Sequence, residues 1–185
     1  MAIQLEYRLL TVEDYHKMIR AGILSQNDQV ELLNGQIIKM SPIGSQHAAC
    51  VEKIDELLKV LLKGKASVRA QNPVILGDLS EPEPDIAIVK RKENYYADGH
   101  PQSDEIFLIM EVADSSLEKD RQAKLPIYAR AMIPEYWIID LENQSVEVYT
   151  NPQDNLYKTK RLFLASDTIQ LEIFGHSLPV KSLLI

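Results

Sequence analysis

The sequence predicts an α/β protein in which helices flank a mixed β-sheet. Apolar residues recur at helical spacing over residues 45–64, whereas "EIFLIMEV" at 105–112 is almost wholly apolar, as in a central strand buried on both faces. The elements fall in the order helix, three strands, helix and further strands, which favours a two- or three-layer sandwich. No linker-like composition divides the 185 residues, so we expect a single domain over 1–185.

The first forty residues predict a short helix followed by a β-hairpin. Thr11-Val-Glu-Asp14 is a capping-box pattern, so a helix is expected from about residue 12 to 20, with Gly22 ending it. "QVELLNGQIIKM" at 29–40 places two apolar-rich arms around Asn34-Gly35, the strongest local signal for a hairpin.

Two further helices are expected. The first follows the break at Ser41-Pro42 and covers 45–64, where Gly64 closes it and Cys50 is a small core residue. The second covers about 118–131, and its Pro126 fits only near a first turn or a kink.

The remaining apolar runs predict strands. They lie within 66–76 (interrupted near Asn72-Pro73), and at 85–89, 105–112, 135–141 and 145–150, and the last 35 residues favour more β-structure and a short tail.

Composition and charge limit the possible functions. A net charge of −7 argues against a surface that coats nucleic acid generally, but it leaves room for a local site where metal ions offset clustered carboxylates. The single cysteine excludes an intrachain disulfide and a Cys-rich zinc site. We expect no signal peptide, because "MAIQLEYRLL" lacks a basic start before a long apolar stretch. No apolar run approaches the length of a membrane span, so we expect none. A cytoplasmic location is therefore expected.

Two acids at strand ends form the first candidate site. Pro84 lacks an N–H and belongs at the first residue of a strand, so a strand is expected to begin at Asp85. A charge at that position costs free energy unless a partner binds it. Glu111 follows the apolar run Ile106–Met110, at the end of a strand expected to be buried. If the two strands are neighbours, both carboxylates can bind one hard cation such as Mg²⁺, which would lower the pKa of a bound water.

A lysine on the following helix is the third candidate. Asp120, Lys124 and Tyr128 stand at i, i+4 and i+8, so they share one face if the segment is helical throughout. A lysine directed at the cation could polarise a phosphate or orient the attacking water.

Three stretches together resemble one known family. "EPDIAIVK", "IFLIMEVADSS" and "KDRQAKLPIYARAMIPEYWIIDL", with the upstream "ELLNGQIIKMSPIGSQHAACV", are similar to the Uma2 (DUF820) family of nucleases, which has the PD-(D/E)XK restriction-endonuclease-like fold. The resemblance runs from about Glu31 to Tyr149. It implies a metal-dependent DNA endonuclease that hydrolyses phosphodiester bonds with Mg²⁺ or Mn²⁺, with DNA as partner. Many nucleases with this fold act as dimers, so a homodimer is expected, and the lack of a long apolar run predicts no membrane association.

The resemblance also implies roles for individual residues. Pro84-Asp85 resembles the "PD" element and Glu111 the acid of the "(D/E)XK" element, which makes Asp85 and Glu111 the metal ligands. The lysine of that element belongs at position 113, where this chain has alanine, and the resemblance points to Lys124 instead.

Other positions also match the pattern of the family. Glu31, His47 and Asp120 do so and are expected to border the site. Met132 stands where relatives typically have Gly, a natural residue at a helix C-terminus, so this departure is interpreted as structural.

Simpler interpretations stand beside each role. Asp85 could be hydrogen-bonded to a turn, and Lys124 could be solvated and paired with Asp120. Glu31 could face water, and His47 is more simply the partner of a nearby carboxylate than a catalyst. A further set consists of residues expected to have no functional role: Tyr128 and Trp137 as core aromatics, and Asp78, Glu81 and Glu83 as a solvated loop.

Three functions compete at this point. The first is the endonuclease, with Asp85, Glu111 and Lys124 as catalytic residues. The second is a catalytically inactive binding or assembly module of the same fold, which the missing lysine at position 113 favours; carboxylates that point into different neighbourhoods would support it. The third is a glycoside hydrolase with paired carboxylates, which would need an aromatic-lined groove, although aromatic residues make up only 6% of the chain.

Overall fold

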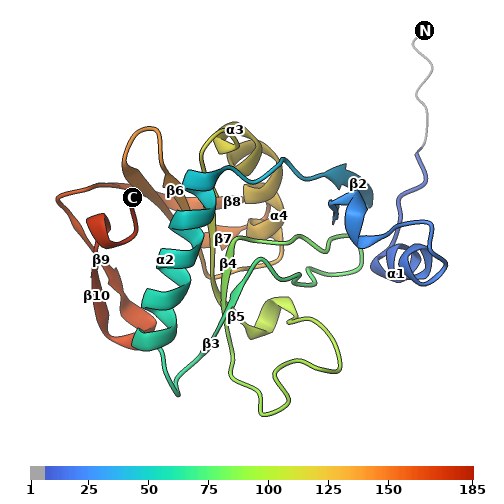
Figure 1. The fold of residues 1–185 in the computed structure, drawn as a ribbon, viewed down its shortest axis with the longest axis horizontal. Coiled ribbons are helices and arrows are strands. Elements are labelled where there is room, and N and C mark those ends of the chain that lie inside the picture. The colour runs from blue at the N-terminus through green and yellow to red at the C-terminus, as the bar shows by residue number, and fades with distance from the viewer. Residues whose placement is uncertain (1–6) are drawn as a thin grey trace, which may run out of the picture.

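The computed structural model describes residues 7–185; residues 1–6, part of the stretch for which no signal peptide is expected, lie outside this range. Its centre is a six-stranded sheet in the order β3-β4-β5-β6-β7-β8 (Figure 1). The strands are β3 (Ser67–Ala70), β4 (Ile86–Val89), β5 (Ile106–Ala113), β6 (Glu135–Asp140), β7 (Ser145–Gln153) and β8 (Leu156–Leu164). Strands β5 and β6 are parallel and the other neighbours antiparallel, which confirms the predicted mixed sheet.

Helices cover the two faces of this sheet. On one face lie α2 (Ser45–Leu61) and a C-terminal pair of strands, β9 (Thr168–Leu171) and β10 (His176–Pro179). On the other face lie α3 (Leu117–Lys119), a π-helical segment (Asp120–Lys124) and α4 (Leu125–Arg130). The molecule is thus a three-layer sandwich, one of the two predicted arrangements.

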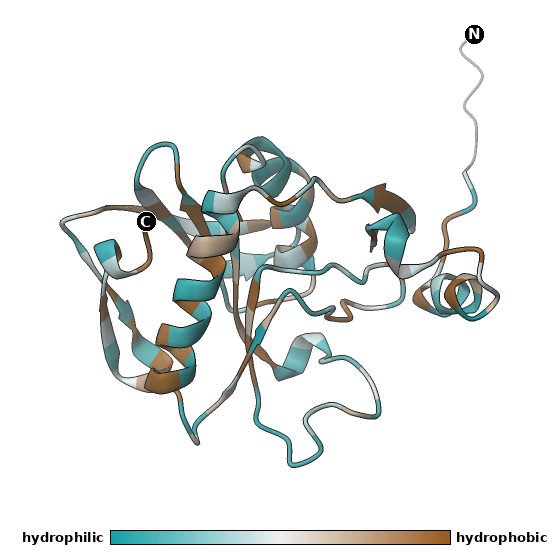
Figure 2. Ribbon diagram, viewed as in Figure 1, coloured by the Kyte–Doolittle hydropathy of each residue, from teal (hydrophilic) through white to brown (hydrophobic). Residues whose placement is uncertain are grey.

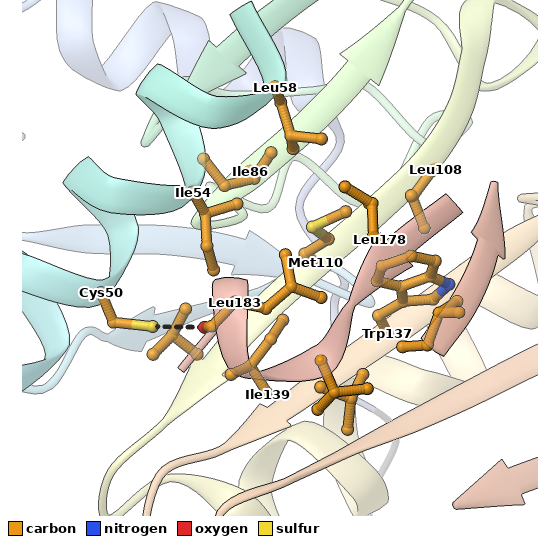
Figure 3. Packing of buried hydrophobic residues seen from close by; sticks show 14 of the residues in the cluster. Cys50, Ile54, Leu58, Ile86, Leu108, Met110, Trp137, Ile139, Leu178 and Leu183 are labelled. Atoms are coloured by element: carbon orange, nitrogen blue, oxygen red, sulfur yellow. Dashed lines mark hydrogen bonds between the residues drawn. The ribbon is translucent and has the colours of Figure 1, made fainter. Parts of the chain in front are cut away.

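A separate apolar core fills the space on each side of the sheet. On the α2 side, Ile54 and Leu58 pack with Trp137, and the Sγ of Cys50 donates a hydrogen bond of 3.2 Å to the carbonyl of Leu183 (Figure 3). On the α4 side, Tyr128 packs in the second cluster of buried residues. Apolar residues accordingly run along the central strands (Figure 2). Trp137 and Tyr128 are fully buried, as predicted, and each such side chain contributes about 1.5–3 kcal/mol.

The N-terminal helix and hairpin lie outside the six-stranded sheet (Figure 1). They are α1 (Val12–Arg20), β1 (Val30–Leu33) and β2 (Gln36–Lys39), and the predicted capping box of Thr11 and Asp14 is present. The hairpin turns at Gly35, whose φ is +75° and where a Cβ atom would lie 2.6 Å from the Cβ of Leu9. Backbone hydrogen bonds between Leu32 and Glu81 tie this unit to the loop before β4.

Three segments differ from the prediction. Helix α2 ends at Leu61, with Leu62 as its C-cap, rather than at Gly64. Strand β4 begins at Ile86 rather than Asp85, because the ladder with β3 starts at the pair Ala70–Ile86. The helix expected at 118–131 is divided, and the N–H of Leu125 bonds to the carbonyl of Asp120, five residues back. A proline ring clashes with the carbonyl of residue i−4, and the wider π turn before Pro126 relieves that clash.

Other details follow the sequence. Pro126 lies in the first turn of α4, and the run at 66–76 holds only the four residues of β3 before its interruption. Within residues 7–185, no helix is both long and apolar enough to cross a membrane.

Candidate active site

Asp85 lies immediately before β4, beside the strand that carries Glu111. Strands β4 and β5 are antiparallel neighbours, and Ile86 pairs with Met110. Asp85, one residue before Ile86, therefore lies beside Glu111, one residue after Met110. The sequence predicted this meeting only on the condition that the strands were adjacent, and they are.

The carboxylate of Asp85 accepts hydrogen bonds from two donors. Its Oδ2 accepts a hydrogen bond of 2.8 Å from the N–H of Val112 and one of 3.0 Å from Nε2 of His47, near the start of α2. The bond with Asp85 raises the pKa of His47, although burial acts in the opposite direction. His47 is therefore the partner of a carboxylate, as the simpler interpretation expected.

Glu111 is held by a lysine and a tyrosine from the opposite layer. Only 3% of the residue is exposed, and its Oε1 accepts bonds of 2.8 Å from Nζ of Lys124 and 2.6 Å from the hydroxyl of Tyr128. Burial raises the pKa of Glu111 to about 8; Lys124 offsets part of this rise, and the charges of Asp85 and Asp120 add to it. Burial thus disfavours the ionised form of Glu111, and a cation bound beside this side chain would stabilise that form.

Lys124 is buried between two acids at the end of the π-helical segment. Its Nζ lies 2.8 Å from Oε1 of Glu111 and 3.6 Å from Oε2 of Glu31. Burial alone would lower the pKa of Lys124, but Glu111, Glu31 and Asp120 outweigh it and hold the pKa above its ordinary value. The side chain is therefore an ammonium ion, and the expectation of a solvated lysine is wrong.

Glu31 and Asp120 complete the acidic surroundings of Lys124. Glu31 is 1% exposed, so the interpretation that it faces water is wrong; it accepts a bond of 3.0 Å from Nζ of Lys119. Asp120 accepts a bond of 2.6 Å from the hydroxyl of Ser116, and burial raises its pKa. Both residues line the same cavity as Asp85 and Glu111.

A cavity of about 750 Å³ joins these groups. All six residues singled out from the sequence line it, namely Glu31, His47, Asp85, Glu111, Asp120 and Lys124. The carboxylates therefore converge on one space rather than point into different neighbourhoods.

A second polar pair in the same cavity was missed. Nε2 of His16, on α1, lies 2.7 Å from Oε2 of Glu81, which is only 5% exposed, so the prediction of a solvated Glu81 is wrong. Glu83 is half-buried, and burial raises the pKa of both Glu81 and Glu83. Asp78 is exposed as expected. No local signal in "SEPEPD" distinguishes these acids, because their burial depends on how the N-terminal unit docks.

Lys119 and the hydroxyl of Tyr128 were also missed as members of the site. Tyr128 was assigned to the core, and its ring is indeed buried there, but its hydroxyl reaches Glu111. The i, i+4, i+8 spacing of Asp120, Lys124 and Tyr128 was the signal that could have included it.

The oxygen atoms of Asp85 and Glu111 suit a hard divalent cation. Each carboxylate uses one oxygen for its protein hydrogen bonds, and over residues 7–185 the other oxygen of each has no such partner. Across the same residues, no three His, Cys, Asp or Glu side chains are grouped as a metal site. A closed zinc site needs four protein ligands, whereas Mg²⁺ uses one or two carboxylates and completes its shell with water and phosphate. The donors present therefore fit Mg²⁺ or Mn²⁺.

Comparisons with known proteins show the family and the fold of the chain. The family model for Uma2, described as "Putative restriction endonuclease", matches residues 12–181. A crystal structure from Anabaena variabilis ATCC 29413, described as "a putative nuclease belonging to DUF820", is 20% identical, with a TM-score of 0.76 over 94% of this chain and 97% of that one. No curated protein matches the sequence. The structural likeness places the chain in the restriction-endonuclease-like fold.

Proposed function

Because the chain belongs to the Uma2 family, we propose that it is a metal-dependent nuclease that hydrolyses phosphodiester bonds of DNA. The observation that carries this proposal is the convergence of three side chains on one cavity: Asp85 just before β4, Glu111 on the neighbouring strand β5, and Lys124 at the end of the π-helical segment. A nuclease needs a cation site, a charge that stabilises the transferred phosphoryl group and room for a water, and these three residues supply the first two.

Asp85 and Glu111 would hold the cation through their unbonded oxygens. When bound, Mg²⁺ or Mn²⁺ would supply a Lewis acid and a water of lowered pKa. His47 and the N–H of Val112 fix the orientation of Asp85, and Tyr128 and Lys124 fix that of Glu111. A ligand oriented by such partners needs no rearrangement when the cation arrives.

Lys124 would act on the phosphate. Its ammonium group is buried and already charged, so it can stabilise the negative charge that develops on the phosphoryl oxygens without a proton transfer. Ala113 leaves no lysine at the position two residues after Glu111, and Lys124 supplies the missing charge from the next layer of the sandwich.

The competing functions are supported less well. A catalytically inactive module would give the carboxylates no reason to converge, and they line one cavity. A glycoside hydrolase would bind sugar on aromatic rings, and among the residues that line this cavity the one aromatic outside the histidines is Tyr15.

The test is cleavage of plasmid and single-stranded DNA with Mg²⁺, Mn²⁺ or EDTA. We expect cleavage that requires the metal and falls at least about a hundredfold in Asp85→Ala and in Lys124→Ala, the size of loss seen when one group that stabilises a transition state is removed. Asp78→Ala and Lys63→Ala remove the same side chains at exposed positions and should cleave normally.

Three outcomes would count against the proposal. Cleavage in EDTA would contradict metal dependence, and cleavage by Asp85→Ala would exclude that carboxylate as a ligand. Loss of cleavage in Asp85→Ala with normal cleavage in Lys124→Ala would remove the lysine from the mechanism and leave the cation site in place.

A further inference from the structure

The cavity that holds the acids has an aliphatic wall. Ile19 on α1 and Met40 and Ile43 in the segment between β2 and α2 line the same space as Asp85 and Glu111. Ile43 is 57% exposed and Ile19 45% exposed, so this wall presents apolar surface to whatever enters. Exposure of this apolar surface to water is unfavourable in free energy, and an apolar part of the substrate that covered the wall would remove that penalty.

The charges of the cavity make ordinary phosphate contacts scarce. Seven of the residues that line it are Asp or Glu, and its two lysines, Lys119 and Lys124, are already paired with Glu31 and Glu111. Proteins that grip duplex DNA gain most of their affinity from free lysine and arginine on phosphates. Lysine and arginine side chains therefore offer this site little affinity for phosphates, and a bound cation together with contacts to the bases would supply more of it.

The depth and size of the cavity point in the same direction. Glu111 and Asp85 are 3% and 9% exposed, so the phosphate must enter the cavity to reach a cation between them. A volume of about 750 Å³ is within the range of sites that enclose a small ligand, which suits one or two nucleotides rather than the width of a double helix. In a duplex, moreover, the flat faces of the bases are stacked inside and cannot reach an aliphatic wall.

We propose that the substrate is single-stranded DNA, and that the base beside the scissile phosphate lies against the aliphatic wall of Ile19, Met40 and Ile43. The inference rests on the proposed nuclease function and specifies its substrate class. Contacts to base faces tolerate any sequence, so the site would select unpaired DNA over paired DNA and show little sequence preference.

The test compares equilibrium binding of a short labelled DNA strand with binding of the duplex that it forms with its complement. Fluorescence anisotropy is measured with the whole chain in Ca²⁺, which takes the same carboxylate oxygens as Mg²⁺, and in EDTA. We expect the strand to bind at least about tenfold more tightly than the duplex in Ca²⁺. The salt dependence should correspond to roughly one or two phosphates, since for single strands the slope is about −0.7 per phosphate.

A matched pair of isoleucines tests the aliphatic wall. Ile43 and Ile173 are each 57% exposed, but Ile173 lies outside the cavity. We expect Ile43→Ser to weaken strand binding about tenfold, the value of burying one aliphatic side chain, and Ile173→Ser to leave it unchanged. Thermal melting of both variants checks that they are folded.

The outcomes separate this inference from the proposed function. Duplex binding as tight as strand binding, equal effects of the two isoleucine variants, or no binding of either DNA would overturn the inference. Cleavage of duplex in preference to single strands would also overturn it while supporting the nuclease. Selective binding of single strands without cleavage in Mg²⁺ or Mn²⁺ would support the inference and contradict the nuclease.

Discussion

Arg121 forms a bidentate ion pair with Glu147: its Nε lies 3.1 Å from Oε2 and its Nη2 lies 2.6 Å from Oε1. Arg121 belongs to the π-helical segment and Glu147 to β7, so the pair fastens the segment that carries Lys124 to the sheet. Burial alone would raise the pKa of Glu147, but the hydrogen bonds from Arg121, Lys160 and Tyr149 lower it to about 2.

Glu147→Gln should destabilise the protein in a pH-dependent way. Because the pKa of Glu147 falls from 4.5 to about 2 on folding, its stabilisation is complete above about pH 4.5 and is lost as the pH falls towards 2. We expect a loss of about 2 kcal/mol at pH 7, discounted for the partly exposed partners, and a smaller loss at pH 3. Urea unfolding at the two pH values measures it, with the exposed Glu142→Gln as control. A loss that is the same at both pH values would contradict the ion-pair explanation.

Tyr128→Phe should lower Mn²⁺ affinity and DNA cleavage, and it should destabilise the protein no more than a matched variant does. The hydroxyl of Tyr128 donates a hydrogen bond to Glu111, the proposed metal ligand, and removal of a group that orients a metal ligand costs about 10- to 100-fold in affinity or activity. Mn²⁺ titration calorimetry and DNA cleavage measure the effect. Tyr157→Phe removes a buried hydroxyl that donates to the carbonyl of Ile133, and it should leave both properties unchanged. Equal losses of Mn²⁺ affinity in the two variants would show that Tyr128 acts only through stability.

Met132→Gly should stabilise the protein. Met132 has a φ of +59° just after α4 and is 59% exposed, so it bears the strain of the left-handed region and gains little from packing. Removal of that strain should raise the free energy of unfolding by about 1 kcal/mol. The higher conformational entropy of glycine in the unfolded chain reduces this gain. Thermal and urea unfolding measure this gain. An unchanged or lower midpoint would mean that the side chain of Met132 contributes packing that its exposure does not suggest.

Gly35→Ala should destabilise the hairpin that carries Glu31. The added Cβ would meet the Cβ of Leu9 at 2.6 Å in a residue with φ of +75°, so strain and overlap together should cost about 2–4 kcal/mol. Gly22→Ala is the control, since its φ is +71° and its Cβ would meet nothing within 4 Å. It should therefore cost only the strain, about 1 kcal/mol. Similar unfolding midpoints for the two variants would show that the contact with Leu9 relaxes without cost.

The sequence was sufficient for the elements whose signals are local. The capping box at Thr11, the Asn34-Gly35 turn and the helical spacing in α2 are each decided by neighbouring residues, and each element is present. The almost wholly apolar β5 is central and buried, because a strand covered on both faces has no polar side.

What the sequence could not decide depends on contacts between distant segments. Glu81 is buried because α1 brings His16 to it, and nothing in residues 78–85 records that. The sequence predicted that Pro126 would lie near a first turn or a kink, but it did not indicate the π-helical turn that precedes Pro126, because the form of that turn depends on how it packs. Within the site, the positions of Asp85, Glu111 and Lys124 were expected, whereas the partners that orient them, such as Tyr128, were identified only from the structure.

The hairpin that carries Glu31 has a consequence for the order in which the protein forms during synthesis. Glu31 and Lys119 are 88 residues apart in the chain, so at 5–20 residues per second the acid leaves the ribosome roughly 4–18 s before its ammonium partner. Until then the carboxylate remains hydrated, since its burial without a partner would be costly. Closure of such distant contacts is slow. The acidic surroundings of Lys124 include Glu31, so during synthesis they cannot be complete before Lys119, which pairs with Glu31, has left the ribosome.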